Sequence, residues 1–184
     1  METRKPSLNW TVEKALLRVS NPWLALVGER LKTPDGEELD YWRIEKTNSA
    51  VVVPIWRQQL VLAPVTYRPG IQAVTLDFPG GRVTTGQSPR AAALLILQRE
   101  LGIEQASIRE LVQLNQVGWP VNSSLSNQLL YGFRAQLHDD IDFAAKSDCQ
   151  RFPLTQSGTS QLLKILPCLQ CRAVLLEMLQ QLDS

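Results

Sequence analysis

This 184-residue sequence has few features of three kinds: runs of like charge, long apolar runs and histidines. Lys and Arg number 19 against 18 Asp and Glu, and no basic cluster stands out, whereas nucleic-acid binding needs a concentrated basic face. No apolar run approaches the roughly 20 residues that cross a bilayer, and residues 1–10 lack the apolar stretch of a signal peptide. We therefore expect a cytoplasmic protein with no nucleic-acid and no membrane partner.

The chain contains few residues that could carry histidine or cysteine chemistry. The single histidine, His138, ends a strand-like run and has no Ser or Cys partner in a recognisable nucleophile motif, so a surface turn is expected. The three cysteines are an odd number, and Cys168 and Cys171 form a CLQC segment inside an apolar helical pattern. Small buried thiols are the favoured interpretation, with metal or redox chemistry left open.

The composition is that of an ordinary folded domain, with 44% hydrophobic and 20% charged residues. Residues 23–33 and 39–46 read as two strands on either side of a Pro-Asp-Gly turn, which predicts an N-terminal β-hairpin. We divide the chain into residues 1–46, an N-terminal segment with this hairpin, and residues 47–184, the main domain, and expect the two to form one compact unit.

Strands precede and follow one central helix in the expected order of elements. Ser88 and Pro89 open this helix and Gly102 stops it, so it spans about residues 89–101. The order predicts an α/β (α+β) domain with a mixed sheet. The other expected elements are extended segments at 49–56, 60–67, 71–78, 108–117 and 126–137 and helical segments at 159–166 and 167–182.

The segment FPGGRVTTGQSPRAAALLILQRELGI, residues 78–103, runs from a glycine loop into that central helix. It resembles the signature of the Nudix hydrolase superfamily, G-x5-E-x7-R-E-U-x-E-E-x-G-U, in which U is a bulky aliphatic residue. With the first glycine of the signature at Gly81, Gln87 takes the place of the first Glu and Arg99-Glu100 the place of the E-E pair. The fit needs no insertion, but Leu95 and Ile96 replace the R-E pair, so the box is degenerate.

The resemblance extends to the ADP-ribose pyrophosphatase-like branch through YWRIEK at 41–46, VTYRPG at 65–70 and the N-terminal hairpin. It covers roughly residues 23–135. It implies a Nudix-like α-β-α sandwich with a mixed sheet and an N-terminal antiparallel β-hairpin extension.

In that family, carboxylates on the helix hold Mg²⁺ or Mn²⁺, which neutralises the diphosphate and helps to generate the nucleophile. Residues 96, 99 and 100 lie at i, i+3 and i+4, so we expect them to face the loop at Gly80–Gly81. Ile96 offers no ligand atom and Arg99 cannot be deprotonated, which leaves Glu100 as the one carboxylate. The expected cofactor is therefore none, or weakly bound Mg²⁺ with Glu100 as metal ligand.

The first functional hypothesis is a catalytically inactive Nudix-fold protein with a regulatory or structural role. It would bind an ADP-ribose-like or other nucleotide, or a protein, and arginines near the glycine loop would hold phosphate oxygens. Alternatively, the tyrosine of VTYRPG packs in the sheet and the arginines are solvated. The candidate ligand-binding residues, two of them carried over from the resemblance, are Tyr67, Arg68, Gly80, Gly81, Arg82 and Arg99.

Two alternatives stay open. A weak or repurposed Mg²⁺-dependent nucleoside diphosphate-X hydrolase would use Glu100 as the catalytic residue, the backbone carbonyl near Gly80 and an aspartate of the late loop. A protein interface or homodimer would use some of the five tryptophans, most of which we expect in the core. The late-loop aspartates are Asp139, Asp140, Asp142 and Asp148.

Overall fold

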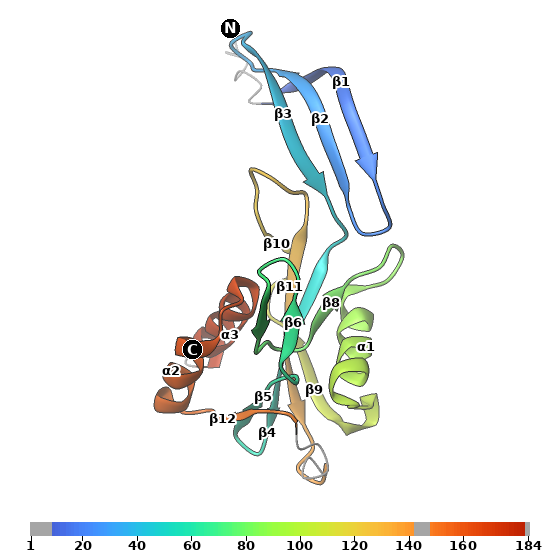
Figure 1. The fold of residues 1–184 in the computed structure, drawn as a ribbon. Coiled ribbons are helices and arrows are strands. Elements are labelled where there is room, and N and C mark those ends of the chain that lie inside the picture. The colour runs from blue at the N-terminus through green and yellow to red at the C-terminus, as the bar shows by residue number, and fades with distance from the viewer. Residues whose placement is uncertain (1–8, 142–147, 183–184) are drawn as a thin grey trace, which may run out of the picture. The chain divides into compact units, whose positions relative to one another are not determined.

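The computed structural model describes residues 9–141 and 148–182 and divides into two compact units (Figure 1). Unit 1 is the chain up to Thr47 together with Pro120–Gln128, and unit 2 is Asn48–Trp119 with Leu129–Ser184. The division after Thr47 lies next to the boundary predicted from the sequence, but residues 120–128 were grouped with the main domain there. They join unit 1 because backbone bonds hold them: the Ile44 N–H donates to the Leu125 carbonyl at 2.7 Å.

Unit 1 is built on one antiparallel sheet with the order β1-β2-β3. Strands β2 (Ala25–Lys32) and β3 (Glu38–Glu45) form the predicted hairpin. Strand β1 (Thr11–Ser20) was not predicted from the sequence. Ion pairs across the strands align the sheet, since Arg43 contacts Glu29 at 3.0 Å and Arg30 contacts Asp40 at 2.8 Å.

Unit 2 contains the predicted mixed sheet. Its order is β10-β11-β4-β5-β12, with β8 also pairing with β4 and β9 with β11. The β4–β11 pair is parallel, whereas β9–β11, β4–β5, β4–β8 and β5–β12 are antiparallel. Two short strands, β6 and β7, form a separate antiparallel hairpin. The bounds are β4 Ser49–Trp56, β5 Gln59–Val61, β6 Thr66–Arg68, β7 Ala73–Thr75, β8 Gly80–Arg82, β9 Ile108–Gln113, β10 Trp119–Pro120, β11 Leu129–Leu137 and β12 Arg151–Pro153.

Strand β4 forms the centre of unit 2, and all eight of its residues are buried. Proline is unusual in a central strand because it lacks a backbone N–H. Pro54 is accommodated because β8 pairs with β4 only as far as Val51 and β5 begins to pair at Ile55. The proline therefore sits in the gap between two partners on the same side of the strand.

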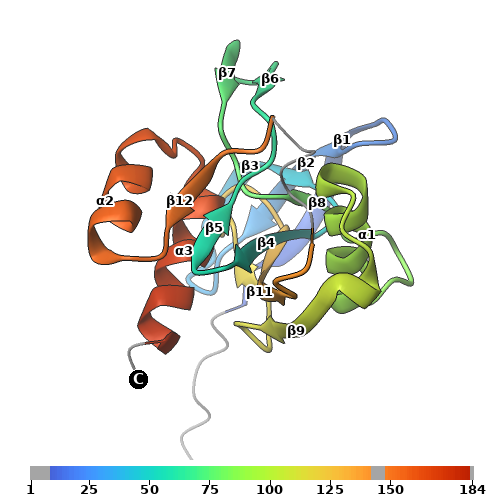
Figure 2. The ribbon, with the colours of Figure 1, turned by 90° about the horizontal axis from the view of Figure 1, so that it is seen from below.

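Helices cover both faces of this sheet, which confirms the α-β-α arrangement (Figure 2). Helix α1 (Pro89–Leu101) packs Ile96 and Leu97 into one core cluster with Val52 of β4. Helix α3 (Leu169–Leu182) covers the other face, where Val174 lies against Gly132 of β11. A ten-residue helix, α2 (Gln156–Ile165), and a short 3-10 turn at Gln105–Ser107 complete the unit.

The ends of α1 agree with the prediction residue by residue. The Ser88 hydroxyl accepts the Ala91 N–H at 3.2 Å, and Pro89 occupies the first helical position. Gly102 has a left-handed conformation with φ 57°, which stops the helix. Within the described residues, no helix has the length and apolar character needed to cross a membrane.

The expectation that most tryptophans are in the core is wrong. All five lie within the described residues, and Trp56 alone is buried, whereas Trp119 is half-buried and Trp10, Trp23 and Trp42 are exposed. These three belong to unit 1, where the buried apolar residues Ala25 and Val27 are small. A single sheet has too few apolar partners of its own to enclose an indole ring.

Candidate functional site

The glycine loop and α1 approach each other very closely. Gly80 and Gly81 lie in β8, opposite Val51 and Ala50 of β4. A Cβ atom added to Gly81 would lie 2.8 Å from Nη2 of Arg99 and 3.1 Å from the Ile96 side chain. A larger residue at position 81 would have to displace Arg99 and shift Ile96, and the helix face that meets the loop is the one the sequence register predicts.

Three residues on this face have different environments. Ile96 is 1% exposed and belongs to the core. The Arg99 guanidinium donates from Nη2 to the Gly80 carbonyl at 3.1 Å and contacts Oε1 of Glu100 at 2.6 Å. The other carboxylate oxygen of Glu100 accepts the Gly80 N–H at 3.1 Å. Gly80, Arg99 and Glu100 thus form a closed ring of hydrogen bonds, which we call the Arg99 ring.

The Arg99 ring does not fit a divalent cation. Mg²⁺ takes about six oxygen ligands in octahedral geometry, and the oxygens here that could serve are the Gly80 carbonyl and the Glu100 carboxylate. Both carboxylate oxygens and the carbonyl are already engaged, and a guanidinium lies between the carbonyl and the carboxylate. The arginine places a permanent positive charge where a divalent cation would need negative ligands.

The remaining candidates for ligand contact lie on β6 and at the end of β8. Tyr67 is exposed on β6, and its neighbour Arg68 pairs with Asp77 at 2.7 Å rather than with the glycine loop. Arg82 is exposed at the end of β8. Gln87, at the position of the first Glu of the box, accepts a hydrogen bond from the Thr84 hydroxyl at 2.8 Å. It therefore stabilises the turn before α1.

The late-loop aspartates that the structure describes lie outside the Arg99 ring. Asp139, Asp140 and Asp148 are exposed, and Asp142 lies outside the described residues. His138 is also exposed, directly before a turn, as expected from the sequence. The Asp139 carbonyl accepts two hydrogen bonds from Arg57, at 2.7 and 3.0 Å.

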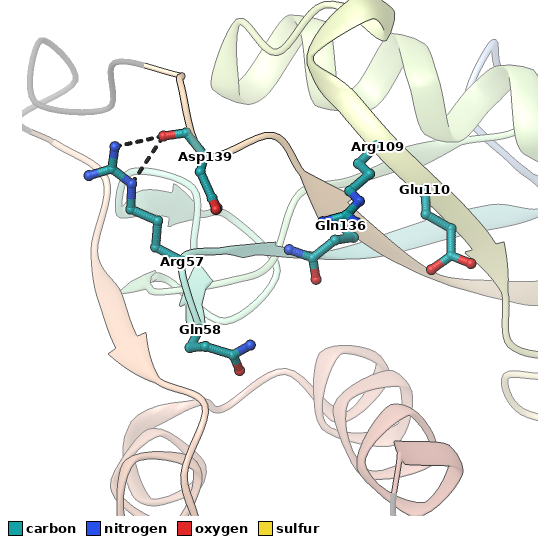
Figure 3. A pocket seen from close by; sticks show the side chains of 6 residues that line it. All are labelled: Arg57, Gln58, Arg109, Glu110, Gln136 and Asp139. Carbon is teal, nitrogen blue, oxygen red and sulfur yellow. Dashed lines mark hydrogen bonds between the residues drawn. The ribbon is translucent and has the colours of Figure 1, made fainter.

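That contact borders a hollow of about 630 Å³, which we call the Arg57 hollow and which was not predicted from the sequence (Figure 3). Arg57 and Gln58 form the tight β4–β5 turn with positive φ angles of 46° and 60°, and Arg57 stacks over the Trp56 ring at 4.5 Å. The wall of the Arg57 hollow contains both basic and acidic side chains, so it does not select an anionic ligand. No local motif marks it, because its lining comes from separate segments: Arg57, Gln58, Arg109, Glu110, Gln136 and Asp139.

Comparison with known proteins supports the fold. No known protein family and no curated protein matches the sequence. Among solved structures, the chain is similar to one described as "Crystal structure of ADP compounds hydrolase", with a TM-score of 0.75 and 20% identity. The match covers 96% of both chains. At this level of identity the similarity shows a Nudix-like fold and leaves the chemistry to be argued from the residues themselves.

Proposed function

We propose that this chain is a Nudix-fold protein that binds a nucleotide-like diphosphate compound and does not hydrolyse it by the metal-dependent route. The observation that carries the proposal is the Arg99 ring, in which a guanidinium bridges Glu100 and the Gly80 carbonyl. A bound metal both neutralises a diphosphate and lowers the pKa of a water nucleophile. Arginine supplies the neutralising charge but cannot generate the nucleophile.

The ligand class follows from two considerations. The similar solved structure is titled as a hydrolase of ADP compounds, and such compounds present paired phosphate groups to their binding site. The Arg99 side chain is 60% exposed, and the contacts described above use only its Nη2. Its other N–H donors are suited to phosphate oxygens. Arg82 is proposed as a further ligand contact because it directly follows Gly81, and Tyr67 and Arg68 are proposed from the resemblance.

The test combines turnover with binding. The protein is incubated with ADP-ribose and Mg²⁺ or Mn²⁺ while AMP release is measured, and calorimetry with and without EDTA measures binding. We expect binding that survives EDTA and no AMP release. Arg99→Ala should weaken binding by at least about tenfold, the loss of one charged hydrogen-bond donor. Arg109→Ala, which removes an equal charge from the wall of the Arg57 hollow, should leave the binding affinity unchanged.

A different result would favour the alternative enzyme. AMP release at ordinary enzymatic rates, abolished by Glu100→Gln and by EDTA, would establish a Mg²⁺-dependent nucleoside diphosphate-X hydrolase. Binding that is lost in Arg109→Ala but kept in Arg99→Ala would show that the ligand binds in the Arg57 hollow.

A second candidate function is self-association through unit 1. Strand β1 lies at the end of its sheet, and edge strands of this kind are templates for pairing with another chain. Sedimentation would then show a homodimer, and the paired change Leu17→Lys with Val19→Lys should convert it to a monomer. The exposed large apolar residues of unit 1 that favour this role are Trp10, Val12, Leu17, Val19, Trp23, Leu26, Trp42 and Leu125.

A further inference from the structure

Two thiols and a carboxylate meet at the beginning of α3, apart from the residues of the Arg99 ring. Cys168 directly precedes the helix, Cys171 lies in its first turn, and Asp77 comes from the segment between β7 and β8. The two sulfur atoms and one carboxylate oxygen all lie within 4.8 Å of one another. Cys171 is buried, as expected from the sequence, but Cys168 is half-buried. We call these three residues the thiol cluster.

The start of the helix gives the two thiols unequal properties. The Cys168 carbonyl accepts the Arg172 N–H at 3.0 Å, and its sulfur accepts the Cys171 N–H at 3.5 Å, so this thiol caps the helix. A hydrogen bond from the Cys171 side chain, with further backbone donors, lowers the pKa of Cys168 to about 6. The same bond, together with burial, raises the pKa of Cys171. One thiol is therefore an accessible nucleophile and the other retains its proton.

Asp77, which contributes one oxygen to the thiol cluster, has an unused hydrogen-bond acceptor. The residue is 7% exposed, and its Oδ2 accepts from the Thr75 hydroxyl at 2.7 Å and from Arg68 at 2.7 and 2.9 Å. Its Oδ1 is buried and has no hydrogen-bond partner within residues 9–141 and 148–182. Leaving a buried carboxylate oxygen unsatisfied is costly, so an oxygen of this kind calls for an explanation. Acceptance of a proton from a neighbouring thiol provides one.

Two chemistries can use such a set of groups. Two thiolates and a carboxylate are also zinc ligands. However, the Arg68 guanidinium is paired with the same carboxylate, and its positive charge opposes a second cation there. A half-buried Cys that caps a helix, followed three residues later by a buried Cys, is the arrangement of dithiol redox motifs. The observations favour thiol–disulfide exchange.

We propose that Cys168 and Cys171 form a redox-active dithiol that is oxidised to an intramolecular disulfide by low-molecular-weight disulfides, with Asp77 as the proton acceptor. The Cys168 thiolate attacks one sulfur of the disulfide RSSR, forming a mixed disulfide and releasing one thiolate RS⁻. Cys171 then passes its proton to Asp77 and attacks the Cys168 sulfur, which releases the second RS⁻. Asp77 returns its proton to one departing RS⁻, and the other takes from solvent the proton that Cys168 released when it ionised, so RSSR is reduced to two RSH while the dithiol loses two hydrogen atoms overall.

The proposal is tested on the full chain in buffers of reduced and oxidised glutathione at increasing oxidised fractions. Acid quenching, alkylation and peptide mass spectrometry then identify the products. We expect a Cys168–Cys171 disulfide, seen as the loss of the mass of two hydrogen atoms, in the wild type and in the control variant Cys149→Ser. Cys171→Ser should stop at a glutathione adduct on Cys168. Cys168→Ser should leave Cys171 unmodified, because the buried thiol is not an accessible nucleophile.

The role of Asp77 has its own readout. Asp77→Asn should slow closure of the mixed disulfide by at least about tenfold, a modest value for loss of a general base, while adduct formation on Cys168 keeps its rate. Asp77→Glu should recover part of the closure rate, and circular dichroism shows whether each variant is folded. Equal closure rates in wild type and Asp77→Asn would overturn the assignment of Asp77.

Two results would overturn the dithiol itself. One is glutathione adducts on all three cysteines at similar rates, with no intramolecular disulfide at any glutathione ratio. The other is one-to-one Zn²⁺ binding in calorimetry that protects both thiols from alkylation and disappears in Asp77→Asn, which would assign a metal centre instead.

Discussion

Two carboxylates of unit 2 that pair with an arginine, Glu100 and Asp77, have surroundings that differ in one respect. In the Arg99 ring both oxygens of Glu100 are engaged, one by Arg99 and one by the Gly80 N–H. In the thiol cluster Arg68 and Thr75 share one oxygen of Asp77, and Oδ1 is left unpartnered among the described residues. A carboxylate whose two oxygens both accept hydrogen bonds stabilises the structure. A carboxylate with a buried oxygen that accepts none retains the capacity to accept a proton.

The largest expected effect comes from adding a carboxylate beside the Arg99 ring. Ile96→Glu places a charge at a position that is 1% exposed, and we expect a loss of roughly 3–5 kcal/mol in the free energy of unfolding, the usual cost of an uncompensated buried charge. Adding Arg99→Glu gives this face of the helix three carboxylates that could bind a cation. Millimolar Mg²⁺ should then raise the Tm of the double variant and not that of the wild type.

The uncharged variant Ile96→Gln with Arg99→Gln is the control for that experiment, since it has similar shape and no ligand charge. A Tm of the Glu double variant that does not respond to Mg²⁺ or Mn²⁺ would show that residues 96, 99 and 100 do not converge on a cation position.

The next effect concerns the pH dependence of the thiol cluster. A pKa of about 6 instead of the ordinary value of 9.0 means that Cys168 stays a thiolate as the pH falls from 9 towards 6. Its alkylation rate by iodoacetamide should therefore change little over this interval and fall below about pH 6, whereas a thiol with the ordinary pKa loses reactivity throughout it. Cys171, whose pKa is raised, should stay unreactive.

Stopped-flow alkylation with peptide mapping measures this profile, and Cys171→Ala tests its cause, because it removes the side-chain hydrogen bond that lowers the pKa of Cys168. A midpoint for Cys168 near the ordinary thiol value would mean that the helix cap and the Cys171 hydrogen bond do not stabilise the thiolate.

A smaller effect is expected when the arginine of the thiol cluster is removed. Arg68→Ala leaves the nearly buried Asp77 without its cation, and the Thr75 hydroxyl still donates a hydrogen bond to it. We expect a loss of about 1–3 kcal/mol at neutral pH, the cost of an undersatisfied buried acceptor. Urea denaturation measures it, and Thr66→Ala, an exposed change on the same strand, is the control.

The smallest effect is expected for the matching change in the Arg99 ring. The Arg99 side chain is 60% exposed and that of Glu100 is 25% exposed, so solvent screens their interaction. Arg99→Ala should cost less than about 1 kcal/mol in urea denaturation. A larger loss for Arg99→Ala than for Arg68→Ala would reverse the comparison between the two carboxylates.

The fold was largely predictable because its signals are local. Ser88, Pro89 and Gly102 specify the ends of α1 through capping chemistry, and the Pro-Asp-Gly turn specifies the β2–β3 hairpin. Strand β1 was missed because nearly all of its residues are exposed, so burial imposes no apolar alternation on its sequence. Exposed tryptophans in unit 1 were missed for the same reason.

The site was predictable only in part. Helical spacing places residues 96, 99 and 100 on one face, but it does not say that Arg99 folds back onto Glu100, which depends on the rotamer of a long side chain. The CLQC spacing shows two thiols near each other. It carries no information on Asp77, which reaches them from a distant segment through the packing of α3 on the sheet.

The parallel pairing of β4 with β11 has a consequence for how the chain folds. Paired residues such as Ile55 and Gln136 are 81 positions apart, so the central contact of unit 2 closes a long loop, and folding is slowed by such topology. At ribosomal rates β4 waits roughly 4–16 s for its partner to be synthesised. Throughout that interval the largely apolar strand β4 is available for aggregation. Pro54 opposes aggregation because it cannot donate a backbone hydrogen bond to another chain.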